Sequence, residues 1–408
     1  MRKKLVLGKI LISFLLILLS ISCENNDELQ RDFGSNYVVE VNVAKQIADV
    51  VDIDSLTGLN LKNKTDRKIK KIDYVLSDKG IIDFYIINFK EEKGFIIISA
   101  DNRVMPILAF SNNGNFELDE KESGVQLWIA SNKQFVKGIR KGEIIPDENI
   151  AELWNIIDAR IEPIEPGEPG EHGEHGEPIG GDSNPPTIIS TVTKGPLLNT
   201  TWGQGGIFND LCPIVDEVNA VSGCPTIALA QILRYHEYPD TYDWSAMPNT
   251  IGSDETARLI RDIGEAIDIN WGAESSGLSP NEQKENIPPA LENTFGYSTT
   301  VSYSAYDGND YNLVKNEING SRPVYMRGGK EEYWAGIFPY YGGGHAWVCD
   351  GYIRTEYTTF STLYFHMNWG WSGTSNGYFA YNNFNPLLNG EYQDFNYELG
   401  IITGIKPY

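Results

Sequence analysis

The chain has 408 residues, a length that allows two or three domains with a full-sized apolar core. Its 41% hydrophobic content, with 22 Tyr, 16 Phe and 9 Trp, excludes an intrinsically disordered protein. Its net charge of −23 argues against nucleic-acid binding, which needs clustered cations to displace counterions from phosphates.

The first 22 residues have the pattern of a signal peptide. Basic residues at 2–4 precede an apolar run from Ile10 to Leu19, which is too short to span a bilayer. Small residues before Cys23 and polar residues after it resemble a bacterial lipoprotein processing site, although Ser20 stands where a leucine is usual. We therefore predict export and a lipid anchor on Cys23 at the outer membrane or cell surface. Plain signal cleavage and secretion are the alternative.

Residues 23–155 form the first predicted domain, with a pattern of their own. The apolar periodicity predicts helices near 43–51 and 126–140 and strands near 83–89 and 95–99. From residue 37 to residue 155 there is no histidine and no cysteine. Because the residue types of catalysis are missing, we expect this small α+β domain to be structural or regulatory.

A linker of residues 156–190 separates the two predicted domains. Between 161 and 186 it holds seven acidic and no basic residues, and glycine recurs at every third place over four triplets. Four triplets are too few for a collagen helix, so an extended, self-repelling and protease-accessible spacer is the better interpretation. We expect His172 and His175 in this spacer to be solvated.

Residues 191–408 have the length of a single domain, and a helical first half followed by a strand-rich second half indicates α+β architecture. Within this domain Cys224 precedes Pro225 and an apolar run at helical spacing. Proline at the first helical position has no N–H to leave unpaired, so the pattern places the thiol at a helix N-terminus. That end favours the thiolate, the nucleophilic form of cysteine. A small buried cysteine that begins a core helix is the alternative.

A thiol nucleophile needs a base that titrates near neutrality, and three histidines lie in this domain. His236 lies roughly 18 Å along the same predicted helix, so it is expected to cap that helix and not to act as the base. His345 follows three glycines, which allow a substrate backbone to approach, and small Ala346 leaves room beside the imidazole. We favour His345, with His366 as a second candidate. Cysteine before histidine is the order found in papain-like enzymes.

The number and spacing of the cysteines limit which metal sites and disulfides the chain could form. Besides Cys23 and Cys224 the chain has Cys212 and Cys349, and four such scattered cysteines suit neither a disulfide scaffold nor a tetrahedral metal site. We therefore predict no metal and no cofactor. We expect Cys349 in the core.

Three ordered stretches carry a resemblance to a known family. They are Gly223-Cys224-Pro225-Thr226 with Ala230-Gln231-Ile232, then Gly344-His345-Ala346-Trp347-Val348, and Asn368-Trp369-Gly370-Trp371-Ser372-Gly373. Together they resemble the streptopain family of bacterial cysteine peptidases, which are papain-fold enzymes made as zymogens. Residues 94–103 and 106–111 resemble the inhibitory propeptide of that family. The resemblance implies a papain-like catalytic domain preceded by a propeptide that is its intramolecular inhibitor.

The same resemblance implies roles for five residues. Cys224 would be the nucleophile and His345 the general base and acid. Gln204 matches the glutamine that donates a hydrogen bond to the oxyanion. Trp369 matches the tryptophan that packs beside the catalytic histidine, and Asn368 is the nearest candidate for orienting that histidine. Upstream of His345, the segment 328–334 is expected to be a loop that reshapes substrate access.

The leading hypothesis is an exported cysteine endopeptidase that hydrolyses protein substrates and stays latent until the linker is cut. One alternative is a catalytically inert papain-like protein that binds partners at the cell surface. The presence of Cys224, His345, Gln204 and Trp369 together argues against it, because a binding module does not need that set. The other alternative is a transglutaminase-like acyl transferase, which would use the same nucleophile and base. Only a product assay separates it from a protease.

Overall fold

The computed structural model of the chain describes residues 37–51, 67–118, 123–147, 149–159, 161, 186–306, 310–334, 338–381, 387–388, 391–392 and 397–408. The predicted signal peptide, Cys23 and most of the acidic linker lie outside these residues. Among the described helices, none combines the length and the hydropathy that a bilayer-spanning segment requires.

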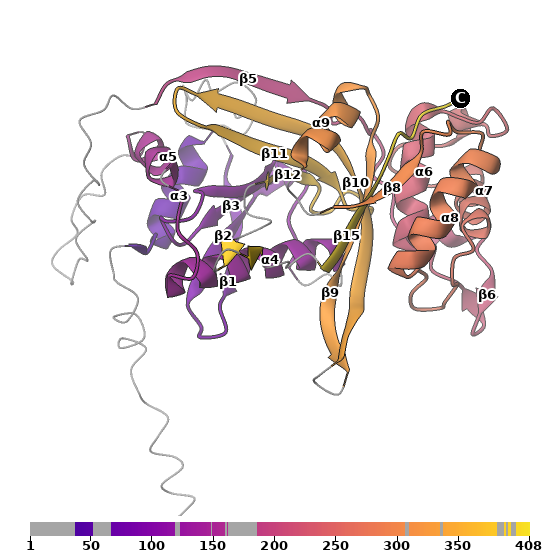
Figure 1. Ribbon diagram of the computed structural model, residues 1–408, viewed down its shortest axis with the longest axis horizontal. Helices are drawn as coiled ribbons and strands as arrows, with labels where there is room; N and C mark the ends of the chain where they lie inside the picture. The colour runs from indigo at the N-terminus through magenta and orange to yellow at the C-terminus, as the bar shows by residue number, and fades with distance from the viewer. Residues whose placement is uncertain are drawn as a thin grey trace, which may run out of the picture. The chain divides into compact units, whose positions relative to one another are not determined.

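In the N-terminal part of the chain the described residues form four antiparallel strands and several helices (Figure 1). The elements are α3 (Val41–Val50), β1 (Ile69–Leu76), β2 (Ile82–Phe89), β3 (Phe95–Ser99), β4 (Ile107–Ser111), α4 (Ser123–Lys141) and α5 (Asn149–Asp158). β3 and β4 are buried along their whole length, which agrees with their continuous apolar runs. The two helices and two strands predicted for this part are confirmed.

The C-terminal part has most of its helices in its first half and its long strands in its second half, as predicted. Its helices are α6 (Cys224–His236), α7 (Asp254–Ala266), α8 (Pro280–Asn293) and α9 (Tyr311–Asn319), with short helices at Gly206–Asn209 and Trp244–Ala246. Its strands are β5 (Ile188–Lys194), β6 (Ile214–Val215), β7 (Val218–Asn219), β8 (Ser302–Ala305), β9 (Val324–Trp334), β10 (Phe338–Tyr357), β11 (Ser361–Asn368), β12 (Gly377–Ala380), β13 (Leu387–Leu388), β14 (Glu391–Tyr392) and β15 (Tyr397–Thr403). The strand β5 and the short strands β6 and β7 nevertheless precede α6.

The segment 328–334 is not a loop, so that expectation is wrong. It forms the outer part of β9 and pairs with β10 from Lys330–Gly342 to Trp334–Phe338 in an antiparallel hairpin. Glycine and a run of charged residues hide the apolar alternation by which a strand is recognised in a sequence.

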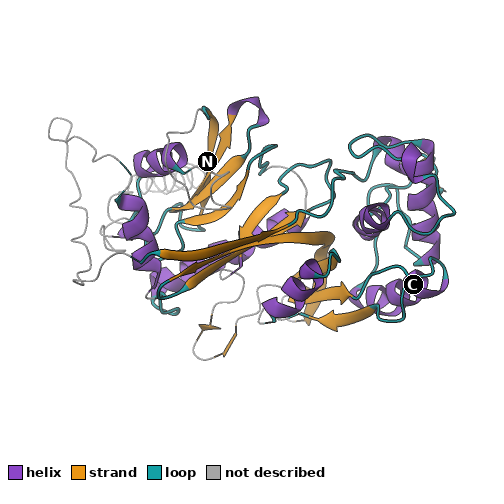
Figure 2. Cartoon of the chain, turned by 90° about the horizontal axis from the view of Figure 1, so that it is seen from above, coloured by secondary structure: helices purple, strands orange, loops and turns teal. Residues whose placement is uncertain are grey.

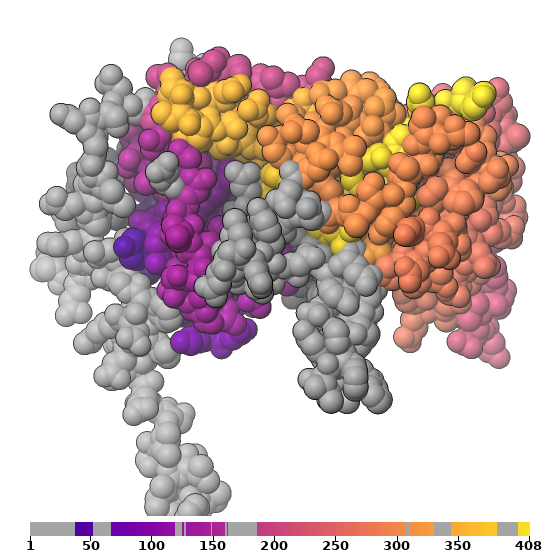
Figure 3. All heavy atoms as spheres, in the orientation of Figure 1, coloured from indigo at the N-terminus to yellow at the C-terminus, as the bar shows by residue number. Residues whose placement is uncertain are grey.

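The two parts of the chain share one antiparallel sheet. Its strand order is β1-β2-β3-β4-β12-β11-β10-β9-β15-β8, with β5 paired to β10. The junction lies between β4 and β12, where Phe110 pairs with Tyr378 and Ala109 with Phe379. In the space-filling view the purple surface of the N-terminal elements directly adjoins the gold surface of β11 (Figure 3). The N-terminal part is therefore packed onto the C-terminal part by backbone pairing as well as by side chains.

One apolar core continues across this junction. Trp128 of α4 packs edge-on against Phe379 of β12 with ring centroids 5.1 Å apart, and Phe379 packs in the same way against Trp369 at 5.3 Å. Phe110 stacks on Tyr378 at 5.4 Å. Aromatic pairs of this kind contribute beyond the area that they bury. They connect the N-terminal domain to a residue that the sequence assigns to the catalytic site.

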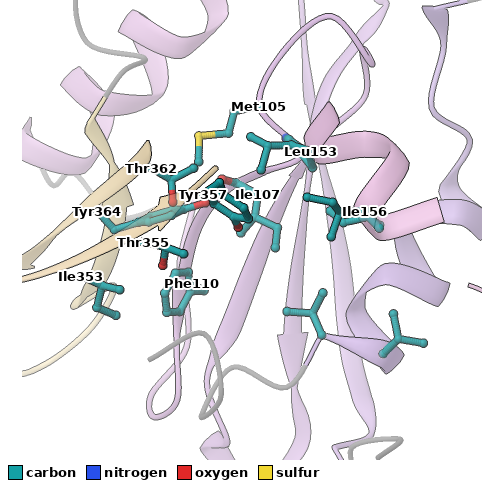
Figure 4. Close-up of a pocket in the computed structure, with 14 residues that line it drawn as sticks. Met105, Ile107, Phe110, Leu153, Ile156, Ile353, Thr355, Tyr357, Thr362 and Tyr364 are labelled. Atoms are coloured by element: carbon teal, nitrogen blue, oxygen red, sulfur yellow. The ribbon is translucent and has the colours of Figure 1, made fainter. Parts of the chain in front are cut away.

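A small apolar cavity of about 70 Å³ remains at the same junction (Figure 4). Met105 and Ile107 line it together with Leu153 of α5, and Ile353 and Tyr364 face them from β10 and β11. The cavity is therefore lined by apolar side chains from both parts of the chain.

A second core lies among α6, α7 and α8. Figures 1 and 2 place these helices together beside β9 and β15, on the side away from β1–β4. Val348 of β10 and Tyr325 of β9 belong to this second core. The β9–β10 pair therefore separates a helical layer from the strands that continue into the N-terminal domain.

Candidate active site

Helix α6 begins at Cys224, as the sequence predicts. Gly223 caps it with φ +82°, and a Cβ at this position would lie 2.7 Å from the Ser276 carbonyl oxygen, so glycine is required there. Burial raises the pKa of the Cys224 thiol to about 11, although the backbone amide of Ala346 and its own amide act to lower it. The effect of Ala346 places the thiol beside the residue that follows His345.

His345 is held on β10 by the turn that follows β11. Its Nε2 atom lies 2.8 Å from the carbonyl oxygen of Trp369 and 3.2 Å from the indole Nε1 of Trp371. The imidazole stacks on Trp371 with centroids 5.6 Å apart and on Trp347 at 6.2 Å. Burial lowers the pKa of His345 to about 4, against the opposite effect of the Trp369 carbonyl. Both shifts favour the neutral form of the group concerned.

Gln204 lies in a loop that is bonded to the turn before Cys224. Its carbonyl oxygen accepts hydrogen bonds from the Ser222 amide at 3.2 Å and the Ser222 hydroxyl at 2.8 Å. The same loop meets the turn after Trp369, because the Ser372 amide donates to the Trp202 carbonyl oxygen at 3.1 Å. The structure thus brings the three ordered sequence motifs and the Gln204 loop together.

Asn368 does not have the position that the sequence predicts. Its side chain donates to the carbonyl oxygen of Thr200 at 2.8 Å and exchanges hydrogen bonds with Gln231 at 3.2 Å. The group that holds His345 is instead the backbone carbonyl of Trp369, the next residue. Asn368 lies at the end of β11, where successive side chains alternate between faces, and a carbonyl has no sequence signature of its own.

Trp369 is buried, and its indole N–H donates to the carbonyl oxygen of Ser375 at 3.1 Å. Its ring packs on Trp347 at 5.3 Å, while Trp371 and Trp347 are the rings that stack on the imidazole. Sequence reasoning assigned no role to Trp371. The sequence signal for Trp371 is its place directly after Gly370 in the third motif. In the structure Gly370 has φ +76°, and the chain turns there so that the Trp371 ring stacks on His345.

Comparisons with known proteins agree with this arrangement. The profile of the peptidase C10 family matches residues 202–241 and 240–379, and that of the Spi protease inhibitor matches residues 53–136. Residues 202–379 thus have the sequence of a peptidase C10 domain. The predicted relation to streptopain-like cysteine peptidases with an inhibitory propeptide is therefore confirmed.

Individual relatives of this C10 peptidase are distant in sequence. Streptopain of Streptococcus pyogenes is 25% identical over 381 residues, 80% of this chain and 81% of its own length. The thiol protease/hemagglutinin PrtT of Porphyromonas gingivalis is 26% identical over 372 residues, 79% of this chain but only 37% of PrtT. The structure of a prointerpain A fragment from Prevotella intermedia covers 84% of this chain and 99% of its own, with 20% identity and a TM-score of 0.55. This likeness confirms the predicted α+β, papain-like fold with a propeptide domain.

Two further histidines and one further cysteine of the C10 peptidase are held by contacts outside the candidate site. His366 Nδ1 lies 2.6 Å from Asp350 Oδ1, and the second oxygen of Asp350 accepts the Leu198 amide at 2.8 Å. His236 is the last residue of α6, and burial lowers its pKa to about 4. Burial raises the pKa of the Cys212 thiol to about 11.

Cys349, expected in the core, is fully buried, and burial raises its pKa well above the usual value. The described residues contain no group of three or more His, Cys, Asp or Glu side chains that could hold a metal ion.

Proposed function

We propose that this C10 peptidase hydrolyses peptide bonds of protein substrates through Cys224 and His345. The observation that supports the proposal best is the meeting of three parts at the N-terminus of α6. The Ala346 amide lies beside the Cys224 thiol, the Trp369 carbonyl holds His345, and the Gln204 loop is bonded to the turn before Cys224.

In the proposed reaction the Cys224 thiolate attacks the substrate carbonyl carbon and forms a thioester. The proton of the thiol passes to His345, which then protonates the leaving amine. Water hydrolyses the thioester with His345 as the base, and the free thiol is restored. The negative oxygen of each tetrahedral intermediate would accept hydrogen bonds from the Gln204 side-chain amide and the Cys224 backbone N–H at the positive end of α6.

We propose that the N-terminal domain keeps the enzyme latent. Its loop reaches the turn that presents the Trp369 carbonyl. There the Ser375 amide donates to the Asn115 carbonyl oxygen at 2.9 Å, and the Glu117 amide donates to the Ser375 hydroxyl at 3.3 Å. Since Ser375 in turn accepts the indole N–H of Trp369, the propeptide contacts the support of His345. In the uncut chain the raised pKa of Cys224 and the lowered pKa of His345 favour the neutral groups over the reactive ion pair.

The remaining organisation follows from the sequence. We propose a signal peptide at 1–22, a propeptide at 23–155, a linker at 156–190 in which maturation occurs, and a catalytic domain at 191–408. Export with a lipid on Cys23 would place the enzyme at the cell envelope, so a membrane would be contacted only through the anchor. The match to the inhibitor family at 53–136 supports the position of the propeptide.

Digestion of casein tests the proposed function. The full chain is treated with a glutamate-specific serine protease until the linker is cut and the propeptide is degraded, as gel electrophoresis shows, and a serine-protease inhibitor then blocks that protease. New casein N-termini identified by mass spectrometry are the expected result. Cross-linked or amine-labelled casein without new termini would instead support an acyl transferase, and unchanged casein would support an inert binding protein.

Replacement of Gln204 tests the oxyanion arrangement. Gln204→Ala is expected to lower kcat by about ten- to a thousandfold with little change in KM, because one hydrogen bond to the transition state is lost. Gln204→Glu, which keeps the size of the side chain but offers no N–H, should fall at least as far. Initial rates on a fluorogenic peptide measure both variants, and an unchanged kcat in either would remove Gln204 from the mechanism.

A further inference from the structure

We infer that Gln231 is a positioning residue that holds the nucleophile helix, the Gln204 loop and the imidazole-binding turn in register. The inference rests on the proposed function. Gln231 lies seven residues after Cys224 on α6, which returns it to nearly the same face of the helix two turns later. It is a fully buried polar side chain inside the apolar run 227–233.

The hydrogen bonds of Gln231 lead to the two other parts of the site. Its Oε1 atom accepts the Trp202 amide at 3.3 Å and the Asn368 Nδ2 at 3.2 Å, and its Nε2 donates to Asn368 Oδ1 at 3.2 Å. Trp202 lies two residues before Gln204. Asn368 directly precedes Trp369, whose carbonyl holds His345. One buried amide therefore bonds α6 to both segments.

The partners leave each amide with one orientation. The Gln231 oxygen must face Trp202, because a backbone amide can only donate. Asn368 donates to the Thr200 carbonyl oxygen at 2.8 Å, and its oxygen accepts the Gly370 amide at 3.2 Å. If either side-chain amide were rotated by 180°, its NH₂ group would face another donor and its oxygen would face another acceptor. The pair therefore joins its segments in a single arrangement.

This arrangement matters because the reaction needs three groups in place at once. α6 carries the thiol, the segment from Thr200 to Gln204 would carry the oxyanion donor, and the turn from Asn368 to Gly370 carries the carbonyl that holds the imidazole. A misplacement of about 1 Å between reacting groups can cost about a hundredfold in rate. Gln231 touches neither substrate nor the reacting atoms, so its effect passes through these neighbours.

Gln231→Met removes the hydrogen bonds and keeps the length of the side chain. We expect kcat per active site to fall by about ten- to a hundredfold, with KM within about twofold, because positioning and not substrate binding is lost. The rate at which an epoxide thiol-protease inhibitor alkylates Cys224 should fall with kcat. The matched control is Gln283→Met.

Gln283 is a suitable control because it is also a buried glutamine on a helix, α8. It donates to the Leu278 carbonyl oxygen at 3.0 Å and accepts the Tyr325 hydroxyl at 2.7 Å, and none of these groups belongs to the site. Gln283→Met should lower the melting temperature about as much as Gln231→Met but retain the wild-type kcat per titrated site.

The measurements use the full chain after its linker has been cut and its propeptide degraded as in the casein assay, with active sites counted by epoxide titration. Equal kcat values in the two variants would overturn the inference, since the role of Gln231 would then be structural only. If Gln231→Met does not fold, Gln231→Glu is measured in its place, because it keeps the acceptors for Trp202 and Asn368 and loses the donor. A kcat loss supports the inference and a wild-type kcat overturns it. If wild-type Cys224 is not labelled at all, the proposed function fails instead.

Discussion

Replacing Cys224 by alanine is expected to abolish casein hydrolysis, with a loss of about 10⁴-fold or more. The change removes only the sulfur atom from a half-buried position at the start of α6, and Gly223 and Pro225, which define that start, remain. The fold should therefore persist, which the far-ultraviolet circular dichroism and the melting temperature would show. If maturation is autocatalytic, this variant should also accumulate as the uncut precursor.

Cys212→Ala and Cys349→Ala are the matched controls for this prediction. Both residues are buried free cysteines of the catalytic domain, and burial raises the pKa of each thiol. Neither lies at a helix N-terminus. Both variants should retain hydrolysis, so activity that survives in Cys224→Ala but disappears with either control would identify a different nucleophile.

The separately expressed propeptide, residues 24–155, is expected to inhibit the processed enzyme in a saturable and dose-dependent manner. Inhibition should reach at least tenfold at micromolar concentration, because the propeptide shares a sheet and an apolar core with the catalytic domain. The linker raises its effective concentration further, to about millimolar, while it remains uncut. Rates of casein hydrolysis at increasing propeptide concentration measure the effect.

Trp128→Ala in the propeptide should weaken this inhibition by about tenfold or more, since Trp128 packs on Phe379 of the enzyme. Trp154→Ala is the control, because that buried indole instead donates to the Val104 carbonyl oxygen within the propeptide. The two variants are compared at equal folded fraction. If the propeptide does not inhibit in trans while a precursor with an uncleavable linker is inactive, latency would come from the geometry of the tether.

Because the two domains share a sheet, cleavage of the linker alone does not separate them. β4 pairs with β12, and aromatic side chains continue from Trp128 through Phe379 to Trp369. Cutting the linker removes the tether but none of these contacts. We therefore expect the cut propeptide to stay bound until it is itself degraded.

Local chemistry in the sequence predicted some of these features well. Proline after Cys224 defined the start of α6, and the apolar runs of β2 and β3 were recognisable because strands buried on both faces need them. The meeting of β4 and β12 could not be predicted in this way. Phe110 and Tyr378 are distant in the chain, and no local pattern encodes which strand edges meet.

In the candidate site, too, features with a local sequence signal were predicted, and those that depend on the fold were not. Residue types and order made Cys224 and His345 the candidates for nucleophile and base, and the family resemblance added Gln204. The support of His345 by a backbone carbonyl was missed, because a carbonyl is common to every residue. Gln231 could have been noticed as a polar residue in the apolar run 227–233, but its partners were knowable only from the fold.

Labelling with an epoxide thiol-protease inhibitor, followed by mass mapping, tests the central assignment most directly. In the processed wild-type enzyme we expect one equivalent of label on Cys224 and parallel loss of casein hydrolysis. In His345→Ala we expect little label, because the base that generates the thiolate is missing. Label on Cys212 or Cys349, or casein hydrolysis that continues after Cys224 is fully modified, would contradict Cys224 as the nucleophile.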